Sequence, residues 1–315
     1  MSQDQQAGTG ENHEDEPNIF PAELVEIVPA PGWHFQEPPP LPAVRKRRVR
    51  LPLVLFLATC LSTFLIGMGG DESATLQQAA LHGLMYAVPL MTILICHEMG
   101  HFIQAWRHGV YASFPYFIPV PLPPIGTMGA VIAMEARMGH RRALFDIGIT
   151  GPLAGLVPTV VFCVLGIHWS VAVSGKGDLG DPLLFNILMH LTGKDIPPGS
   201  HLMLHPLAFA GWVGLLITSL NLFPIGQLDG GHVLYALLGK KAHTVARILL
   251  ASALVAVVFF KLYMWLLMIF LLFMMGPDHP PTANDDEPLG WPRIVLGWLT
   301  LAFIPIGFTP MPFQP

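Results

Sequence analysis

Long apolar stretches separated by short polar or proline-rich segments dominate the pattern of this chain. Four of them are long enough to predict membrane-spanning helices, at about 51–69, 79–106, 143–173 and 205–222. A further apolar stretch, 247–275, can form one tilted span or a tight hairpin, because Lys261 interrupts it near its middle. A last one runs from 294 to about 308. We therefore expect an all-α polytopic membrane protein with six or seven transmembrane helices.

The segment 113–135 breaks this pattern, because it is apolar but rich in proline. Five prolines and Gly126 punctuate it before residue 127, so it cannot be a helix. We expect a re-entrant or β-hairpin loop that ends in a short strand at 128–134. Irregular backbone persists at membrane depth only where protein covers it or where it lines a watery cavity.

Composition supports a membrane protein. Of the 315 residues, 52% are hydrophobic and only 12% are charged, and the mean hydropathy of +0.55 lies outside the usual range of soluble globular proteins. Basic residues are too few and too scattered to form a nucleic-acid surface. Cys60, Cys96 and Cys163 all fall in apolar segments without paired spacing and are interpreted as small buried hydrophobes.

The N-terminal 44 residues differ from the rest of the chain. They hold eight acidic side chains, many prolines and no Lys or Arg, so we expect a disordered acidic cytoplasmic tail, followed by a membrane domain at 45–315. No signal or transit peptide is visible in this segment. Five basic residues in Arg45–Arg50, with further basic residues at 137–142 and 240–247, predict a multi-pass protein of the cell (inner) membrane with a cytoplasmic N-terminus.

The sequence His97-Glu98-Met99-Gly100-His101 lies within the second predicted span. Helical spacing places the two imidazoles one turn apart on one face, where both can ligate one metal ion while Glu98 acts as general base. Ionisable groups at membrane depth are costly unless they are paired, metallated or hydrated, so they indicate a functional site. The pattern is typical of a zinc hydrolase.

Catalytic zinc usually takes three protein ligands, so a third residue is needed. His108 lies about 10 Å further along the helix than His101, and Cys96 points about 100° away from its neighbour His97. Two intramembrane carboxylates remain. Asp146 is most simply the ion-pair partner of the adjacent Arg141 and Arg142. Asp229 has no basic neighbour in sequence, and proline and glycines place it on irregular backbone near the inner face, so we favour it as the third ligand.

Taken together, these motifs resemble the site-2 protease family of intramembrane zinc metalloproteases, peptidase family M50. The resemblance is carried by His97-Glu98-Met99-Gly100-His101, by Asn221-Leu222-Phe223-Pro224 and by Leu228-Asp229-Gly230-Gly231, and it extends to 126–132 and 151–155. His279-Pro280-Pro281 and the final apolar segment are similar to a bacterial subgroup related to the chloroplast-type members. The segment 174–200 is too short for the PDZ-like insert of the best-known members. The resemblance covers about 51–313.

The resemblance implies His97, His101 and Asp229 as ligands of one Zn²⁺ per chain, Glu98 as catalytic base, and Asn221 as a polar group near the reacting carbonyl. We expect a zinc-dependent intramembrane endopeptidase in the lipid bilayer that cleaves within or near transmembrane segments of protein substrates. An unwound substrate can be held extended by strand addition at Met128, Gly129, Ala130, Val131 and Ile132. The alternatives are an inactive membrane pseudoprotease that binds client helices and a metal transporter.

Overall fold

The computed structural model describes residues 49–69, 73–134 and 139–314, so the acidic tail at 1–44 lies outside the described residues. Helices dominate, and they are α1 (Arg50–Met68), α2 (Leu76–Arg107), α3 (Arg141–Trp169), α4 (Leu183–Leu191), α5 (Pro206–Asn221), α6 (Asp229–Leu238), α7 (Lys241–Phe259), α8 (Leu266–Met275), α9 (Trp291–Leu301) and α10 (Ile304–Gly307). Two small antiparallel sheets pair β1 (Tyr116–Pro119) with β2 (Thr127–Val131) and β3 (Val171–Ser174) with β4 (Ser200–Met203). The predicted fold class is confirmed.

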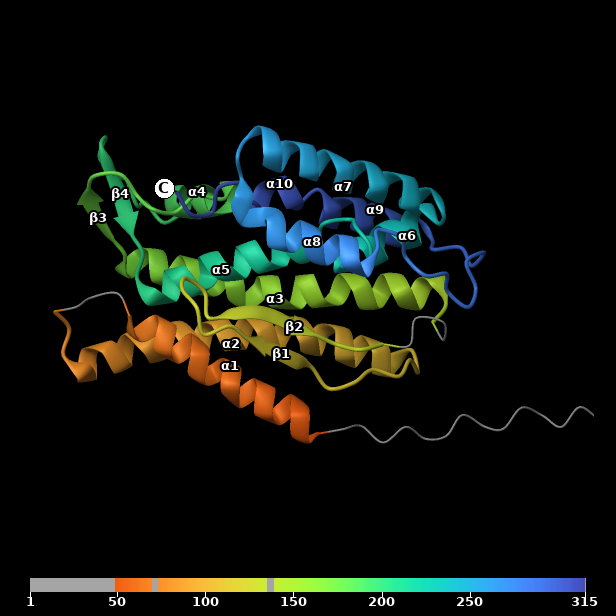
Figure 1. The fold of residues 1–315 in the computed structure, drawn as a ribbon, viewed down its shortest axis with the longest axis horizontal. Helices are drawn as coiled ribbons and strands as arrows, with labels where there is room; N and C mark the ends of the chain where they lie inside the picture. Colours follow the sequence, from red (N-terminus) through yellow and green to blue (C-terminus); the bar gives the residue numbers. More distant parts are fainter. Residues whose placement is uncertain (1–48, 70–72, 135–138, 315) are drawn as a thin grey trace, which may run out of the picture. The chain divides into compact units, whose positions relative to one another are not determined.

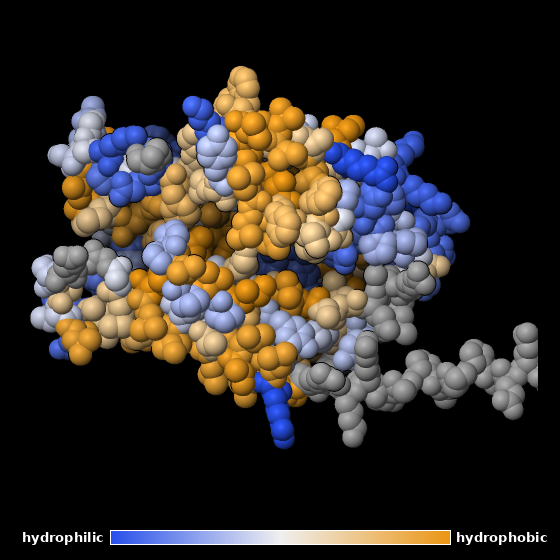
Figure 2. Space-filling view, viewed as in Figure 1, coloured by the Kyte–Doolittle hydropathy of each residue, from blue (hydrophilic) through white to orange (hydrophobic). Residues whose placement is uncertain are grey.

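Among the described residues, α1, α2, α3 and α7 are long and apolar enough to cross a membrane. The shorter α5 was also predicted as a span, and its 16 residues pack between its neighbours with Trp212 fully buried. Figure 2 shows hydrophobic residues across the middle of the visible face and hydrophilic residues gathered near its ends. A multi-pass membrane protein accounts for this surface, while the number of spans, six or seven, stays a prediction.

Helices α2 and α3 run side by side (Figure 1) and make the most extensive helix–helix contact among the described residues. Their contact depends on small residues, because a Cβ on Gly100 of α2 would lie 2.5 Å from the carbonyl oxygen of Thr150 on α3. Gly151 and Gly155 of α3 face α2 in the same way. The small residues at 151 and 155 therefore permit the close contact of the two helices.

The proline-rich segment forms the β1–β2 hairpin, as predicted for a non-helical loop. Two hydrogen bonds tie its turn to the helices: Ser62 Oγ of α1 donates to the carbonyl of Gly126 at 2.7 Å, and Tyr86 Oη of α2 donates to the carbonyl of Ile125 at 2.6 Å. The predicted strand at 128–134 was too long. Strand β2 ends at Val131, and Met134 makes only an isolated bridge to Ala112.

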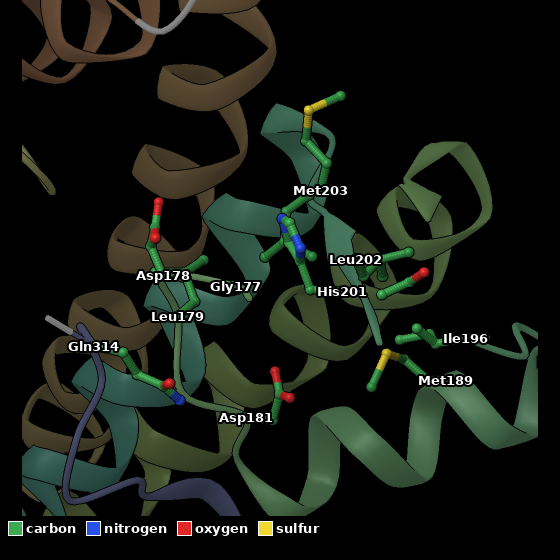
Figure 3. A pocket seen from close by; sticks show the side chains of 12 residues that line it. Gly177, Asp178, Leu179, Asp181, Met189, Ile196, His201, Leu202, Met203 and Gln314 are labelled. Carbon is green, nitrogen blue, oxygen red and sulfur yellow. The ribbon is translucent and has the colours of Figure 1, made fainter. Parts of the chain in front are cut away.

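The segment 174–200, for which the sequence analysis predicted no element, contains regular structure. Helix α3 ends at Trp169 because the chain turns into β3, which pairs with β4, and the amphipathic α4 packs Phe185 into the core. A cavity of about 320 Å³ lies here, lined by residues that include Asp178, Asp181 and His201 (Figure 3).

The ambiguous stretch 247–275 forms a hairpin. Helix α7 ends at Phe259, a short 3₁₀ helix at Tyr263–Trp265 follows, and α8 doubles back alongside α7 (Figure 1). Lys261 sits in the turn with a φ of 59°. Leu250 of α7 and Leu272 of α8 pack together against Ile225, which closes the hairpin onto the loop before α6.

The ion-pair partner predicted for Asp146 was wrong. Asp146 does not bind its neighbours Arg141 and Arg142, as expected from sequence. It accepts two hydrogen bonds from Arg293 of α9, at 2.7 and 2.9 Å, and lies 3.1 Å from His108. Arg141 instead donates to the carbonyls of Ala236 and Leu237 at the end of α6. The partners of Asp146 therefore come from other helices and not from the residues beside it in sequence.

Candidate metal centre

Three residues predicted as metal ligands converge in the structure. His97 and His101 project from α2, and Asp229 is the first residue of α6. His97 Nε2 lies 3.0 Å from Asp229 Oδ2, and His101 Nε2 lies 3.2 Å from Asp229 Oδ1. Each of the three residues offers a ligand atom within 4.8 Å of the other two. The imidazoles are 3% and 6% exposed and the carboxylate 13%, so the cluster is largely removed from solvent.

The hydrogen bond on the far side of His101 orients its Nε2 toward the cluster, where this nitrogen can ligate a cation. His101 Nδ1 lies 2.7 Å from the carbonyl oxygen of Ile147, which can only accept, so Nδ1 carries the proton. In a neutral ring Nε2 then presents a lone pair toward the Asp229 carboxylate. Two acceptors facing each other at 3.2 Å repel unless a positive charge, either a proton or a metal ion, lies between them.

The donor set fits zinc. Two imidazole nitrogens and one carboxylate oxygen make a known set of protein ligands for catalytic zinc, with a fourth position left for water or substrate. Bonds of about 2.0–2.2 Å in a tetrahedral arrangement separate neighbouring ligand atoms by roughly 3.4 Å. The separations of 3.0 and 3.2 Å are close to that value, so small movements suffice to accept the ion. The Ile147 carbonyl supplies the outer hydrogen bond that such histidines usually make.

Glycines of α3 form the floor beneath the two histidines. A Cβ on Gly151 would lie 2.0 Å from His101 Nε2, and a Cβ on Gly155 would lie 3.0 Å from the Cβ of His97. The ligand positions therefore exist only because α3 carries hydrogen atoms at these points. The resemblance seen in the sequence included 151–155 but assigned these glycines no part in metal binding.

Asp229 reaches the histidines because α6 begins in a confined space. A Cβ on Gly230 would lie 1.8 Å from the carbonyl oxygen of Leu222, and a Cβ on Gly231 would lie 2.3 Å from that of Gly226. The prediction of irregular backbone at Asp229 was wrong, since the irregular segment ends at Leu228 and Asp229 opens a helix. The glycine pair allows that helix to start directly beneath the preceding loop.

Glu98 and Asn221 lie beside the cluster. Glu98 is 3% exposed, and no hydrogen-bond partner for its carboxylate is found in the part of the chain that the structure describes. Asn221, the last residue of α5, places its Nδ2 3.4 Å from His97 Nε2. A carboxylate thus follows the ligand His97 in the chain, and an amide donor lies beside its Nε2. The arrangement can hold a metal ion, accept a proton and stabilise a developing negative charge.

The remaining predicted residues fall outside this cluster. His108 pairs with Asp146, and Cys96 is not among the metal-ligating group found in the described residues. Met128, Gly129, Ala130 and Val131 lie in β2, and Ile132 follows directly after it. The side chains of Met128 and Val131 are 47% and 53% exposed.

Comparisons with known proteins agree with this chemistry. The family model of peptidase family M50 matches residues 85–264, more than half of the chain, and the match spans His97, Glu98, His101 and Asp229. The chain belongs to peptidase family M50. The name of this family denotes peptidases, and the group formed by His97, His101 and Asp229 could hold one zinc ion.

Relatives in plants carry the same family character. The chain is 33% identical over 168 residues to "Probable zinc metalloprotease EGY1, chloroplastic" of Oryza sativa subsp. japonica, which covers 50% of this chain and 29% of the relative. It is 29% identical over 243 residues to "Probable zinc metalloprotease EGY2, chloroplastic" of Arabidopsis thaliana, covering 72% of this chain and 42% of the relative. The chain thus spans less than half the length of these relatives.

Among solved structures, the chain is similar to the "Site-2 Protease from Methanocaldococcus jannaschii". The two are 19% identical, the match covers 74% of this chain and 91% of the other, and the TM-score is 0.37.

Proposed function

We propose that this protein is a zinc-dependent intramembrane endopeptidase that hydrolyses peptide bonds within or near the transmembrane segments of membrane proteins. One observation carries the proposal: His97, His101 and Asp229 converge, and α2, which carries both histidines and Glu98, is long and apolar enough to span a bilayer. The catalytic unit corresponds to residues 45–315. A metal transporter would place its ligands along a path, whereas these residues form one compact group with a base next to it.

Each residue has a separate task in the proposed reaction. Zinc, when bound, supplies Lewis-acid chemistry that acidifies a water molecule and polarises a carbonyl. Glu98 takes the proton from the attacking water and later delivers it to the leaving amine. Asn221 can donate a hydrogen bond from Nδ2 to the oxyanion, because this amide lies beside the metal ligand His97. His97, His101 and Asp229 hold the metal, and Gly151 and Gly155 leave room for the imidazoles.

The β1–β2 hairpin gives the proposed substrate a place to bind. A transmembrane helix hides its peptide groups, so it must unwind before cleavage, and its freed backbone then needs partners. Within the described residues β1–β2 is a two-stranded sheet, which leaves one edge of β2 unpaired. We propose that the substrate adds to this edge along Met128, Gly129, Ala130, Val131 and Ile132.

We further propose that the N-terminus and the metal-binding end of α2 lie on the cytoplasmic side of the cell (inner) membrane. His101 is six residues, or roughly 9 Å, from Arg107 at the end of α2. Arg141, Arg142, Lys240 and Lys241 belong to the same polar end, because Arg141 binds the carbonyls at the end of α6, just before the two lysines. Basic residues favour the cytoplasmic side, so this end faces the cytoplasm.

The test compares membrane proteomes of cells that carry the wild type or Glu98→Gln, since the amide keeps the size of the side chain and removes the base. The proposal expects new protein termini within or beside transmembrane segments with the wild type only, and equal zinc content in both purified proteins. Equal sets of termini would contradict the protease and support a membrane protein that binds client helices without cutting them.

A further inference from the structure

A second recess adjoins the metal centre on the side of β2. It has a volume of about 180 Å³ and lies between the end of the sheet, α3, α6 and the segment after α8. Its walls are mostly apolar and include Val131, Ile132 and Ile147 of α3. Ile147 is also the residue whose carbonyl holds His101. His232 and His279 supply polar groups to this recess.

These two histidines form a hydrogen-bonded pair whose proton positions follow from the structure. His279 Nδ1 lies 2.6 Å from the carbonyl oxygen of Pro280, so Nδ1 carries a proton. Burial lowers the pKa of His279 to about 4, so the ring is neutral at pH 7 and its Nε2 is an acceptor. His232 Nδ1 lies 2.7 Å from that nitrogen and must donate to it.

This arrangement leaves a lone pair on His232 Nε2. When Nδ1 carries the proton of a neutral imidazole, Nε2 can only accept a hydrogen bond. Within the described residues Nε2 has no hydrogen-bond partner, although the ring is half-buried and lines the recess. A donor that enters the recess can therefore form a hydrogen bond with this free acceptor.

Strand addition at β2 would bring such a donor. Alternate N–H groups of an added strand point toward β2, and the others point away from it. The outward groups would face the far wall of the recess, where His232 follows Asp229 by three residues on α6. An outward N–H left without a partner would weaken binding of the extended chain.

We propose that His232 binds a backbone N–H of the substrate segment held at the metal centre, and that His279 is a positioning residue that fixes the His232 tautomer. The inference rests on the proposed function and deepens it, because it assigns a binding residue for the extended peptide. The sequence analysis noted His279-Pro280-Pro281 as part of the family resemblance. The proposal assigns its histidine a role, which is to fix the tautomer of His232.

Binding of two hydroxamates to the purified, zinc-loaded full-length protein tests the proposal. Acetohydroxamate reports the metal alone, and an apolar tripeptidyl hydroxamate reports the metal and the peptide site together. His232→Phe keeps an aromatic ring but removes the acceptor. It should bind the tripeptidyl probe about three- to tenfold more weakly than the wild type, while acetohydroxamate affinity and zinc content stay unchanged.

N-methylated versions of the tripeptidyl probe identify the bond itself. Methylation of the amide that faces His232 should weaken binding to the wild type by a similar factor and have little effect on His232→Phe. His279→Phe should reduce this discrimination, since the His232 tautomer is no longer fixed. The matched control is His243→Phe, because His243 Nε2 lies 3.0 Å from the His279 carbonyl oxygen but is not among the residues lining the recess.

The outcomes separate this proposal from the general function. If no probe methylation distinguishes the wild type from His232→Phe, or if this variant loses zinc or acetohydroxamate binding, the assignment of His232 is overturned. If His243→Phe changes probe binding as much as His279→Phe, His279 has only a structural role and does not fix the His232 tautomer. Failure of acetohydroxamate to bind the wild type would instead contradict the zinc centre.

Discussion

Replacement of Gly151 by alanine should empty the metal centre although no ligand residue is changed. The new Cβ would lie 2.0 Å from His101 Nε2, about 1.4 Å short of ordinary van der Waals contact. Metal–ligand distances tolerate only about 0.2 Å, so His101 must leave the coordination sphere or α3 must move away from α2. Loss of an outer partner alone costs roughly 10- to 100-fold in metal affinity, and displacement of a ligand should cost at least about 100-fold.

Competition between the purified protein and a zinc chelator measures this loss. Gly155→Ala provides a graded comparison, because its Cβ would lie 3.0 Å from the His97 Cβ and demands a smaller shift. Gly139→Ala is the control, since its Cβ would meet neighbours only at 3.7 Å or more. Zinc affinity should fall in the order wild type and Gly139→Ala, then Gly155→Ala, then Gly151→Ala. A monodisperse, folded Gly151→Ala protein with wild-type zinc affinity would refute the claim that Gly151 leaves necessary space for His101.

Four further predictions follow from the same structure. Asp229→Ala should lower zinc content strongly while Cys96→Ala leaves it unchanged, as measured by elemental analysis; full zinc in Asp229→Ala would remove Asp229 from the ligand set. Asn221→Ala should lower turnover by about ten- to a thousandfold with zinc retained, and loss of zinc together with activity would make Asn221 structural. In intact cells without the native cysteines, an impermeant thiol reagent should label a cysteine at Ser174 but not one at His140, and the reverse pattern would invert the topology. Burial lowers the pKa of His279 from 6.5 to about 4, so between these pH values the unfolded chain binds a proton that the folded chain does not. The contribution of neutral His279 to stability is therefore complete above pH 6.5 and is lost as the pH falls toward 4. Thermal unfolding of His279→Gln should depend less on pH in that window than thermal unfolding of the wild type.

The local parts of the metal centre could be predicted from sequence, because helix geometry alone places His97 and His101 on one face. Asp229 could be favoured as the third ligand because no basic residue stands near it in the chain, and the structure brings it to both histidines. Its local backbone could not be predicted. The helix starts at Asp229 because the carbonyls of Leu222 and Gly226 press against two glycines, a contact that spacing does not reveal.

Features that depend on distant contacts were missed or misassigned. Asp146 binds Arg293, which lies 147 residues further along the chain. The sequence analysis instead chose Arg141 and Arg142 because they are close to Asp146 in sequence. Helix α4 lies in the segment 174–200, for which the sequence pattern predicted no element, and strands β3 and β4 flank it. The pair of His232 and His279 joins two motifs 47 residues apart, and each motif alone gave no sign of the other.

Removal and return of zinc in one purified preparation tests the central claim most directly. The protein is reconstituted in lipid vesicles with a membrane substrate found in the proteome comparison, and zinc content and cleavage are measured on the same samples. The account predicts about one zinc per chain, loss of cleavage after chelation and recovery when one equivalent is restored. Glu98→Gln should bind the same zinc and stay inactive. Cleavage that persists in the zinc-free protein, or in zinc-loaded Glu98→Gln, would contradict the account.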